Sequence, residues 1–296
     1  MPIIKLLRIE QWAKNFFVFL PLFFDRRLTD IDCLLSSFLA FLAFCLAASG
    51  IYCLNDIYDR ESDKQHPLKR MRPIASGKVT LGKAYLVMSI CFIVSILLAQ
   101  SVSFVGHGSD SHVSLTAVIV AYIAINVAYC IRLKRIAIVD VFTIAVGYVL
   151  RVLAGGVAGG IYISHWLILM TFLLALFIAF AKRRDDVLIY EESGKMMRDN
   201  VNRYNLTFVN QIISVVASIT MICYVMYTVS PDVVERYESN YVYLTSIFVL
   251  AGIIRYLQLT IVDAESGSPT RVLLSDRFIQ GCIVGWIALF AVIIYF

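Results

Sequence analysis

Apolar residues occur along this chain in long runs, and short segments between the runs hold most of the charged residues. A run of about 20 apolar residues is long enough to cross a bilayer as a helix. The first run is short, and it becomes a full span only if it extends back through Trp12; otherwise it lies half-embedded. The pattern predicts nine transmembrane segments: 14–25, 36–55, 82–104, 113–131, 137–157, 164–181, 207–229, 241–262 and 278–296.

The even spacing of these segments leaves no room for a soluble domain. We therefore expect an all-α, polytopic membrane protein, a single domain over residues 1–296. The composition agrees, because 60% of the residues are hydrophobic and the mean hydropathy is +0.79, whereas soluble domains are about 45–50% apolar. Seven cysteines lie singly inside apolar runs without a C-x-x-C pair. We interpret them as small apolar residues rather than metal ligands or disulfides.

The basic residues indicate the orientation of the chain in the membrane. With the N-terminus inside, alternate loops hold nearly all lysines and arginines, and the outside segments hold only Arg26, Arg27 and Arg236. This is the positive-inside pattern. It predicts a protein of the cell membrane with its N-terminus on the cytoplasmic side and its C-terminus on the outer side. It also explains the net charge of +5 without nucleic-acid binding. No small-residue cleavage site follows the first apolar run, so we predict a first helix there rather than a signal peptide.

A dense group of acidic residues follows the second predicted helix. On a helix, Asn55, Asp56, Asp59 and Asp63 fall at roughly 0°, 100°, 40° and 80°. All four oxygen ligands would then share one face at the cytoplasmic boundary. Carboxylates this close repel one another unless a cation neutralises them, and hard oxygen ligands favour Mg²⁺. The alternative is a solvated helix end that pairs with nearby lysines.

Residues of the types that bind phosphate follow directly after this acidic group in the sequence. Lys69 and Arg72 are cationic donors suited to phosphate, and arginine can bind it with two parallel hydrogen bonds. Ser76 and Gly77 add a hydroxyl and backbone donors. Metal ligands followed directly by phosphate ligands are more specific than either part alone, so we predict a metal-dependent site for a phosphorylated substrate.

Residues 55–77, with the pattern N-D-x-x-D-x-x-x-D-x-x-H-P-x-K-x-x-R-P-I-A-S-G, resemble the first aspartate-rich motif of the UbiA superfamily of intramembrane prenyltransferases. The resemblance implies nine helices around a lipid-accessible cavity, with the diphosphate of a donor held by Mg²⁺. Asp56, Asp59 and Asp63 would be the catalytic carboxylates, and these three with Asn55 would be the metal ligands.

The second motif departs from that superfamily's D-x-x-x-D pattern. Asp185 and Asp186 are adjacent here, and Lys182, Arg183 and Arg184 precede them. The added positive charge would suit further phosphate groups. Four other blocks, residues 8–15, 129–136, 140–155 and 268–277, resemble the decaprenyl-phosphate phosphoribosyltransferase branch.

That branch resemblance implies transfer of 5-phosphoribose from phosphoribosyl diphosphate to a polyprenyl phosphate, with release of diphosphate. The alternative is transfer of a prenyl group from prenyl diphosphate to an aromatic or quinone-precursor acceptor. Besides the two substrates, the expected partners are membrane lipids. The sequence leaves the oligomeric state open, a homo-oligomer included.

The candidate substrate ligands are basic or polar residues near the inside ends of the helices, together with two ionisable residues within a span. Inside loops are basic for topological reasons alone, so no single cation proves a contact. Asp140 and Arg151 lie on the fifth predicted span, where ionisable groups are costly unless they are paired or hydrated. We assign Asp140 to the donor ribose or to a metal-bound water, and Arg151 to the acceptor's phosphate or to a structural carboxylate. The full set is Lys14, Asn15, Lys69, Arg72, Tyr129, Arg132, Lys134, Asp140, Arg151, Lys182 and Arg183.

Overall fold

Helices form along the apolar segments because the hydrocarbon core offers no water to the backbone, so each N–H and C=O must be paired within the segment. The computed structural model describes residues 2–65, 69–105, 113–194, 200–263, 272 and 275–295, and every regular element in these ranges is a helix. His66, Pro67 and residues 268–271 lie outside the described residues. The all-α prediction is confirmed for the described part of the chain.

Compact packing divides the chain into two units. Unit 1 comprises Met1–Lys134 and Val146–Ile163, and unit 2 comprises Arg135–Ala145 and Ser164–Phe296. The boundary falls within helix α7, whose first residues belong to unit 2 and whose remainder belongs to unit 1. A single domain over residues 1–296 stays a prediction.

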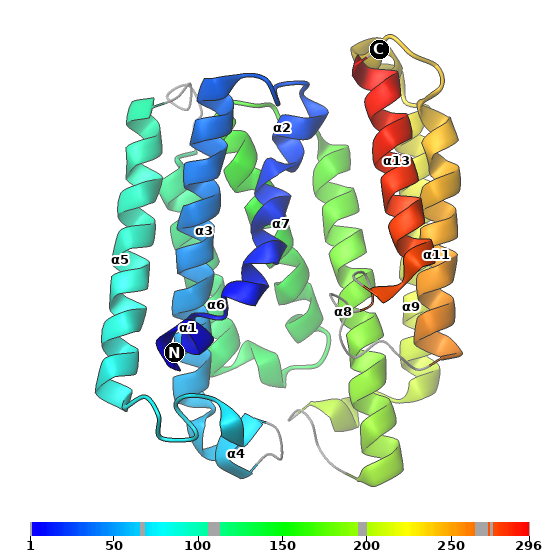
Figure 1. Ribbon diagram of the computed structural model, residues 1–296. Coiled ribbons are helices and arrows are strands. Elements are labelled where there is room, and N and C mark those ends of the chain that lie inside the picture. Colours follow the sequence, from blue (N-terminus) through cyan, green and yellow to red (C-terminus); the bar gives the residue numbers. More distant parts are fainter. Residues whose placement is uncertain are drawn as a thin grey trace. The chain divides into compact units, whose positions relative to one another are not determined.

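Unit 1 contains the N-terminal helices and the first acidic motif (Figure 1). Helix α3 is its central element, because η1, α5 and α6 all pack against it. Its helices are α1 (Pro2–Leu7), η1 (Ile9–Phe19), α2 (Leu20–Phe24), α3 (Ile31–Tyr58), α4 (Arg60–Gln65), η2 (Lys69–Met71), α5 (Leu81–Val105), α6 (Leu115–Ile131), most of η4 (Leu133–Arg135) and most of α7 (Val139–Gly159).

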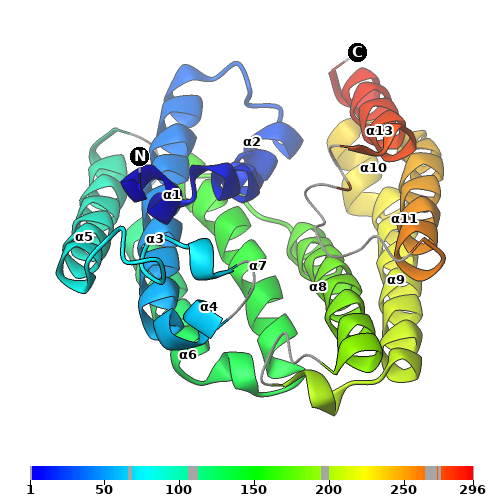
Figure 2. The ribbon, with the colours of Figure 1, turned by 60° about the horizontal axis from the view of Figure 1, so that its bottom comes forward.

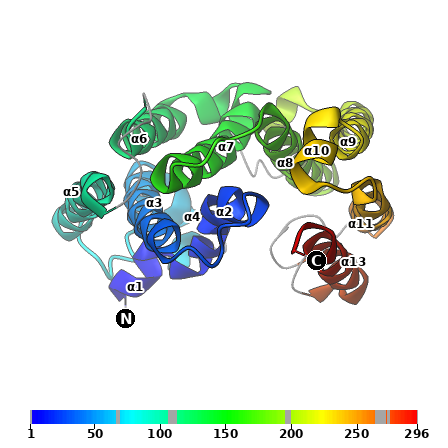
Figure 3. The same ribbon diagram turned by 90° about the horizontal axis from the view of Figure 1, so that it is seen from above.

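Unit 2 is a second group of antiparallel helices. Helix α8 packs against α9, and α11 packs against both α9 and α13; α11 and α13 lie side by side in Figure 3. Its helices are α8 (His165–Ser193), η5 (Val201–Arg203), α9 (Leu206–Thr228), α10 (Pro231–Tyr237), η6 (Val242–Thr245), α11 (Ser246–Ile261) and α13 (Arg277–Tyr295).

Six helices in the described ranges are long and apolar enough to cross a membrane, and two shorter apolar helices, Leu115–Ile131 and Arg277–Ile293, accompany them. Large apolar side chains such as Ile93, Ile222 and Val284 are more than half exposed on these helices. Exposed apolar surface of this extent is expected where helices face lipid. A multi-pass membrane protein is therefore the architecture of this chain.

The first predicted span differs from a regular α-helix. Residues Ile9–Phe19 form a 3₁₀ helix, η1, that continues into the short α2, with Pro21 in its first turn. At a rise of about 2.0 Å per 3₁₀ residue and about 1.5 Å per α residue, the two elements extend roughly 30 Å. That length matches the hydrocarbon core of about 30 Å. The count of nine spans stays a prediction, and this tighter helix explains how so short a segment could be one of them.

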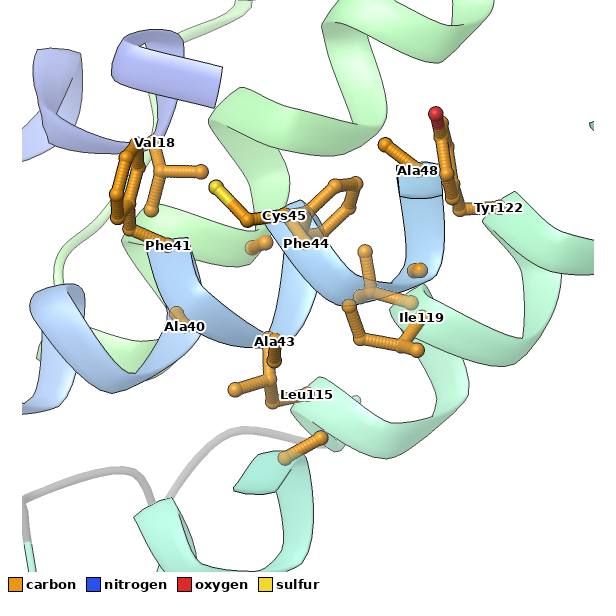
Figure 4. Packing of buried hydrophobic residues seen from close by; sticks show 14 of the residues in the cluster. Val18, Ala40, Phe41, Ala43, Phe44, Cys45, Ala48, Leu115, Ile119 and Tyr122 are labelled. Atoms are coloured by element: carbon orange, nitrogen blue, oxygen red, sulfur yellow. The ribbon is translucent and has the colours of Figure 1, made fainter. Parts of the chain in front are cut away.

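The core of unit 1 joins α3 to η1, α5, α6 and α7. Phe44 of α3 meets Tyr122 of α6 with their ring centroids 4.9 Å apart, and Ala43 and Ile119 pack beside them (Figure 4). Glycine allows the closest approach, because a β-carbon at Gly155 of α7 would collide with the backbone of Val18 in η1. Small residues permit this kind of close helix contact in membrane proteins.

Candidate active site

The first acidic residue of the motif, Asp56, lies in the last turns of α3 and is 2% exposed. Its Oδ1 atom accepts hydrogen bonds from two guanidinium groups, Arg8 Nη2 at 2.5 Å and Arg72 Nη1 at 3.2 Å. One carboxylate oxygen therefore contacts two cations, one from before Asp56 in the chain and one from after it. Because Asp56 is buried, its negative charge needs such compensation.

Helix α3 ends at Tyr58, and the short α4 begins at Arg60, so Asp59 interrupts the helix (Figure 2). The expectation of one continuous helix through Asp63 was wrong, because Asp59 caps α3 with non-helical backbone angles. Asp63, on α4, is nevertheless 3% exposed and accepts a 2.6 Å hydrogen bond from Arg72 Nη1. The same nitrogen thus bridges Asp56 and Asp63.

Asp59 and Asn55 form a second pair around another cation. Lys134 Nζ lies 2.5 Å from Asp59 Oδ1 and 3.5 Å from Asn55 Oδ1. The amide of Asn55 also donates to Asp59 Oδ2 at 3.0 Å. Lys134 follows α6, so the contact closes a separation of 75 residues in the chain. The four predicted ligands of the motif are therefore grouped in two pairs, each around one cationic nitrogen.

This grouping fits a divalent cation that is shared with a substrate. Within the described ranges, no three His, Cys, Asp or Glu side chains converge on one point. Mg²⁺ typically binds proteins through one or two carboxylates and completes its shell with water and substrate phosphates. The bridge from Asp56 to Asp63 already places two carboxylates around one positive charge. The donor set therefore fits Mg²⁺ in that mode.

The loop after the motif uses its own backbone donors. Ser76 N–H donates to the carbonyl of Arg72 at 2.9 Å, and Gly77 N–H donates to the carbonyl of Ile74 at 3.1 Å. The Ser76 hydroxyl lies 3.4 Å from the Pro73 carbonyl. The donors of Ser76 and Gly77 that we expected to be available to a substrate thus form hydrogen bonds within the turn. Gly77 has a φ of 75° in this turn. Their role is to shape the loop that presents Arg72.

Arg151 is buried in unit 1 and joins η1, α6 and α7. Its guanidinium donates to Asn15 Oδ1 at 2.7 Å, to the Gly147 carbonyl at 2.6 Å and to the Tyr122 hydroxyl at 3.0 Å. Rings of Phe44, Tyr122 and Tyr148 lie within 5.8 Å of it. Within the described residues, Arg151 forms no ion pair. The partners of its guanidinium are neutral acceptors and aromatic rings, and not the structural carboxylate that was one of the two alternatives.

Asp140 and Arg183 form the centre of a buried network in unit 2. Arg183 Nε donates to Asp140 Oδ2 at 2.7 Å, and Arg183 Nη1 donates to Asp186 Oδ2 at 2.8 Å. Asp140 is fully buried and Arg183 is 1% exposed. Two carboxylates share this one guanidinium, so Arg183 adds no surplus positive charge here, contrary to the expectation for the basic second motif.

Arg184 also serves the fold. It donates to the side chain of Asn210 on α9 and to the carbonyls of Thr260 and Ile261 at the end of α11. The last carbonyls of a helix lack partners within it, and a cation there also opposes the helix dipole. Arg184 therefore ties α8 to α9 and α11 rather than offering its charge to a substrate.

The sequence model of the UbiA prenyltransferase family matches residues 29–280. The chain belongs to the UbiA prenyltransferase family. It is 32% identical over 305 residues to the decaprenyl-phosphate phosphoribosyltransferase of Corynebacterium glutamicum, across 99% of this chain and 86% of that protein. It is 31% identical over 306 residues to the decaprenyl-phosphate phosphoribosyltransferase of Mycolicibacterium smegmatis, across 99% and 92% of the two chains. The resemblance expected from the sequence is confirmed in both family and branch.

A solved UbiA homolog from Archaeoglobus fulgidus, bound to DMAPP and Mg²⁺, matches the fold of the chain with a TM-score of 0.72. The alignment covers 100% of this chain and 99% of that one at 18% sequence identity. At this identity the likeness shows a shared fold. The UbiA fold of this chain thus rests on two independent comparisons, one of sequence and one of structure.

The other predicted ligands of this UbiA-family protein lie at helix ends or on helix surfaces. Their roles in substrate binding stay predictions, as do those of Asn15, Asp140, Arg151 and Arg183. Lys14 is half-buried on η1, Lys69 begins η2, Tyr129 is half-buried on α6, Arg132 is exposed where α6 ends, and Lys182 is exposed on α8.

Two residues of these clusters, Arg8 and Tyr204, were not among the candidate site residues predicted from the sequence. Tyr204 accepts the N–H of Ile138 at 2.6 Å and donates to Asp140 Oδ1 at 3.1 Å. Ile138 has a φ of 72°, which a β-branched residue rarely adopts. Nothing in the local sequence marks Tyr204, because its partners lie 64 and 66 residues away. For Arg8, its place at the start of the 8–15 block was the available signal.

Replacing Tyr204 with phenylalanine is expected to lower the free energy of unfolding by about 1–2 kcal/mol, because Ile138 N–H and one Asp140 oxygen lose their partner. Burial raises the pKa of Tyr204 to about 12. In the unfolded chain the phenol loses its proton near its ordinary pKa of 10.0, so the contribution of Tyr204 falls as the pH rises from there toward 12. Unfolding in detergent at about pH 9 and about pH 11 should therefore show a smaller difference between the variants at the higher pH. Equal differences would contradict this assignment.

Proposed function

We propose that this UbiA-family enzyme transfers 5-phosphoribose from phosphoribosyl diphosphate to a polyprenyl phosphate and releases diphosphate. The observation that carries the proposal is the cluster in unit 1, where Asp56, Asp59 and Asp63 alternate with Arg8, Arg72 and Lys134. Carboxylates suit a divalent cation, and interleaved cations suit the phosphates bound to it. Near full-length similarity to decaprenyl-phosphate phosphoribosyltransferases supports phosphoribose as the group transferred.

The residues of the cluster would divide the work between them. Asp56 and Asp63, with Asp59 and Asn55, would hold Mg²⁺, which when bound supplies positive charge that stabilises the departing diphosphate. Arg72 and Lys134, which neutralise these carboxylates in the structure, would orient the diphosphate oxygens. Preorganised cations of this kind favour the transition state, in which charge builds on the leaving oxygens.

The acceptor needs little activation by the protein. A polyprenyl phosphate is an anionic oxygen nucleophile at neutral pH, so no strong general base is required. Its oxygen forms the new bond to C1 of the ribose, while the bond from C1 to the diphosphate breaks and its electron pair leaves with the diphosphate. Direct displacement inverts C1 and yields a β-linked product.

The orientation of the chain belongs to the same proposal. The segments predicted to lie inside, which include the loops of the first and second motifs, hold 21 of the 26 lysines and arginines. The positive-inside rule therefore supports a cytoplasmic N-terminus and active site and a C-terminus outside. Phosphoribosyl diphosphate, a water-soluble anion, would then reach the cluster from the cytoplasm, and the lipid acceptor would reach it from the membrane.

Two parallel incubations of the purified protein with Mg²⁺ test the donor. One contains phosphoribosyl diphosphate and a polyprenyl phosphate, and the other contains a prenyl diphosphate and 4-hydroxybenzoate. We expect a phosphoribosylated lipid in the first and no product in the second. Product in the second incubation alone would reject the proposal in favour of the aromatic prenyltransferase.

A further inference from the structure

The N-terminal segment around Arg8 is tied firmly to α3. The Ser49 hydroxyl donates to the carbonyl of Leu7 at 2.8 Å and accepts the indole N–H of Trp12 at 3.0 Å. Leu6 is fully buried against Cys53 and Ile74. These contacts secure the chain on both sides of Arg8, so the position of Arg8 is set by tertiary structure rather than by a loose terminus.

Arg8 itself adopts a strained backbone conformation. It lies between α1 and η1 with a φ of 51° and a ψ of 54°, in the left-handed region. This conformation is energetically unfavourable for a residue with a β-carbon. Glycine would avoid that cost, and yet the position carries a long cationic side chain. The conformation directs the guanidinium to Asp56 and sets it 4.9 Å above the ring of Tyr52.

Arg8 and Arg72 differ in the carboxylate partners that each would keep if Asp56 bound a metal ion. Both donate to the same atom, Asp56 Oδ1. A divalent cation on that oxygen would repel both guanidinium groups, because like charges repel. Arg72 would keep Asp63 at 2.6 Å. For Arg8, Asp56 is the one carboxylate that it contacts in the described part of the chain.

We propose that Arg8 binds the diphosphate of the donor substrate, and that it neutralises Asp56 only until the metal ion and the donor arrive. The inference rests on the proposed function insofar as it requires a diphosphate donor, whichever group that donor transfers. The guanidinium of Arg8 lies over the face of the Tyr52 ring. This contact does not use the N–H donors of Arg8, so they can turn toward another acceptor. Arg8 is 21% exposed, so a substrate oxygen can reach it while Asp56, at 2%, stays buried.

The proposal predicts effects of opposite sign on metal and donor. In Arg8→Ala, Asp56 loses a competing cation, so Mn²⁺, a spectroscopic substitute for Mg²⁺ with similar oxygen preference, should bind about threefold tighter or more. Without the Arg8 donors, phosphoribosyl diphosphate and inorganic diphosphate should each bind about tenfold weaker or more in the presence of Mg²⁺. A general disturbance of the fold would instead weaken both.

The matched control is Arg60→Ala. Arg60 lies on α4 beside the cluster, its side chain is 38% exposed, and its ion-pair partner is Glu61 at 3.7 Å. Its removal changes the net charge equally without touching Asp56. Arg8→Gly removes the same side chain and also relieves the strained backbone, so it replaces the alanine variant if that variant does not fold, as judged by thermal unfolding in detergent.

Electron paramagnetic resonance of Mn²⁺ and calorimetric titration of the two phosphate ligands supply the readouts. Arg8→Ala that binds both diphosphates within about twofold of wild type would overturn the proposal. Equal effects of Arg8→Ala and Arg60→Ala would overturn it as well. If wild type binds inorganic diphosphate and no phosphoribosyl diphosphate, the proposed function fails, while the comparison with inorganic diphosphate still decides the role of Arg8.

Discussion

Replacing Asp56 with asparagine is expected to lower turnover by about a hundredfold to a thousandfold, the range seen when one group that stabilises transition-state charge is removed. Asp56 is the most buried carboxylate of the cluster and contacts both Arg8 and Arg72. Asparagine keeps the shape and one carbonyl oxygen but removes the negative charge that a divalent cation requires. The measurement is the formation of phosphoribosylated lipid by the purified variant across a Mg²⁺ titration.

The variant should remain folded, because Arg8 and Arg72 are each more than a fifth exposed and can be solvated when Asp56 loses its charge. Glu61→Gln is the matched control. Glu61 is an exposed neighbour on α4 whose side chain pairs with Lys64, so it undergoes the same change of charge outside the cluster and should retain wild-type turnover. An Asp56→Asn variant within about tenfold of wild type would contradict the metal assignment.

Replacing Arg183 with methionine is expected to lower the free energy of unfolding by about 3–5 kcal/mol, the cost of removing one partner from a buried ion pair. The fully buried Asp140 and the adjacent Asp186 would lose their shared cation. Equilibrium unfolding in detergent micelles measures the effect. Lys182→Met is the control for stability, because Lys182 is the exposed neighbour on the same helix and surface substitutions usually change stability by less than about 0.5 kcal/mol.

A double-mutant cycle separates the network from simple packing. Asp140→Asn removes one of the two carboxylates, so adding it to Arg183→Met should restore part of the lost stability. The two single effects should therefore fail to add, by about 1 kcal/mol or more. Additive effects would show that Arg183 stabilises α8 by packing alone, and the network from Tyr204 to Asp186 would lose its support.

Much of the membrane fold could be predicted from the sequence because lipid imposes a local rule. Each spanning segment must be apolar along its length and must pair its own backbone, so the segments are visible one by one. The predicted 36–55, 82–104 and 207–229 correspond to α3, α5 and α9. The first span was the least predictable, since an apolar run does not distinguish a 3₁₀ helix from an α-helix.

The candidate site was predictable only where its residues are close together in the chain. Asn55 to Asp63 and Arg72 form a continuous signature, and the structure joins them in one cluster. The break at Asp59 was missed, because the angular spacing of four residues assumes that the helix continues. The partners of the basic second motif were hidden for the same kind of reason: the letters show charge, but they do not show that Arg183 pairs with Asp140 and that Arg184 donates to the end of α11.

By itself, the sequence determined that this chain crosses a membrane repeatedly, and it located the acidic residues of the candidate site and the loop that carries Arg72, because hydropathy and spacing act over short stretches of chain. Tertiary structure alone decided which cation compensates which carboxylate. Arg8 reaches Asp56 across 48 residues, and Lys134 reaches Asp59 across 75. A buried carboxylate must be compensated by some cation, but the packing of helices, which no local pattern encodes, selects the one that is near.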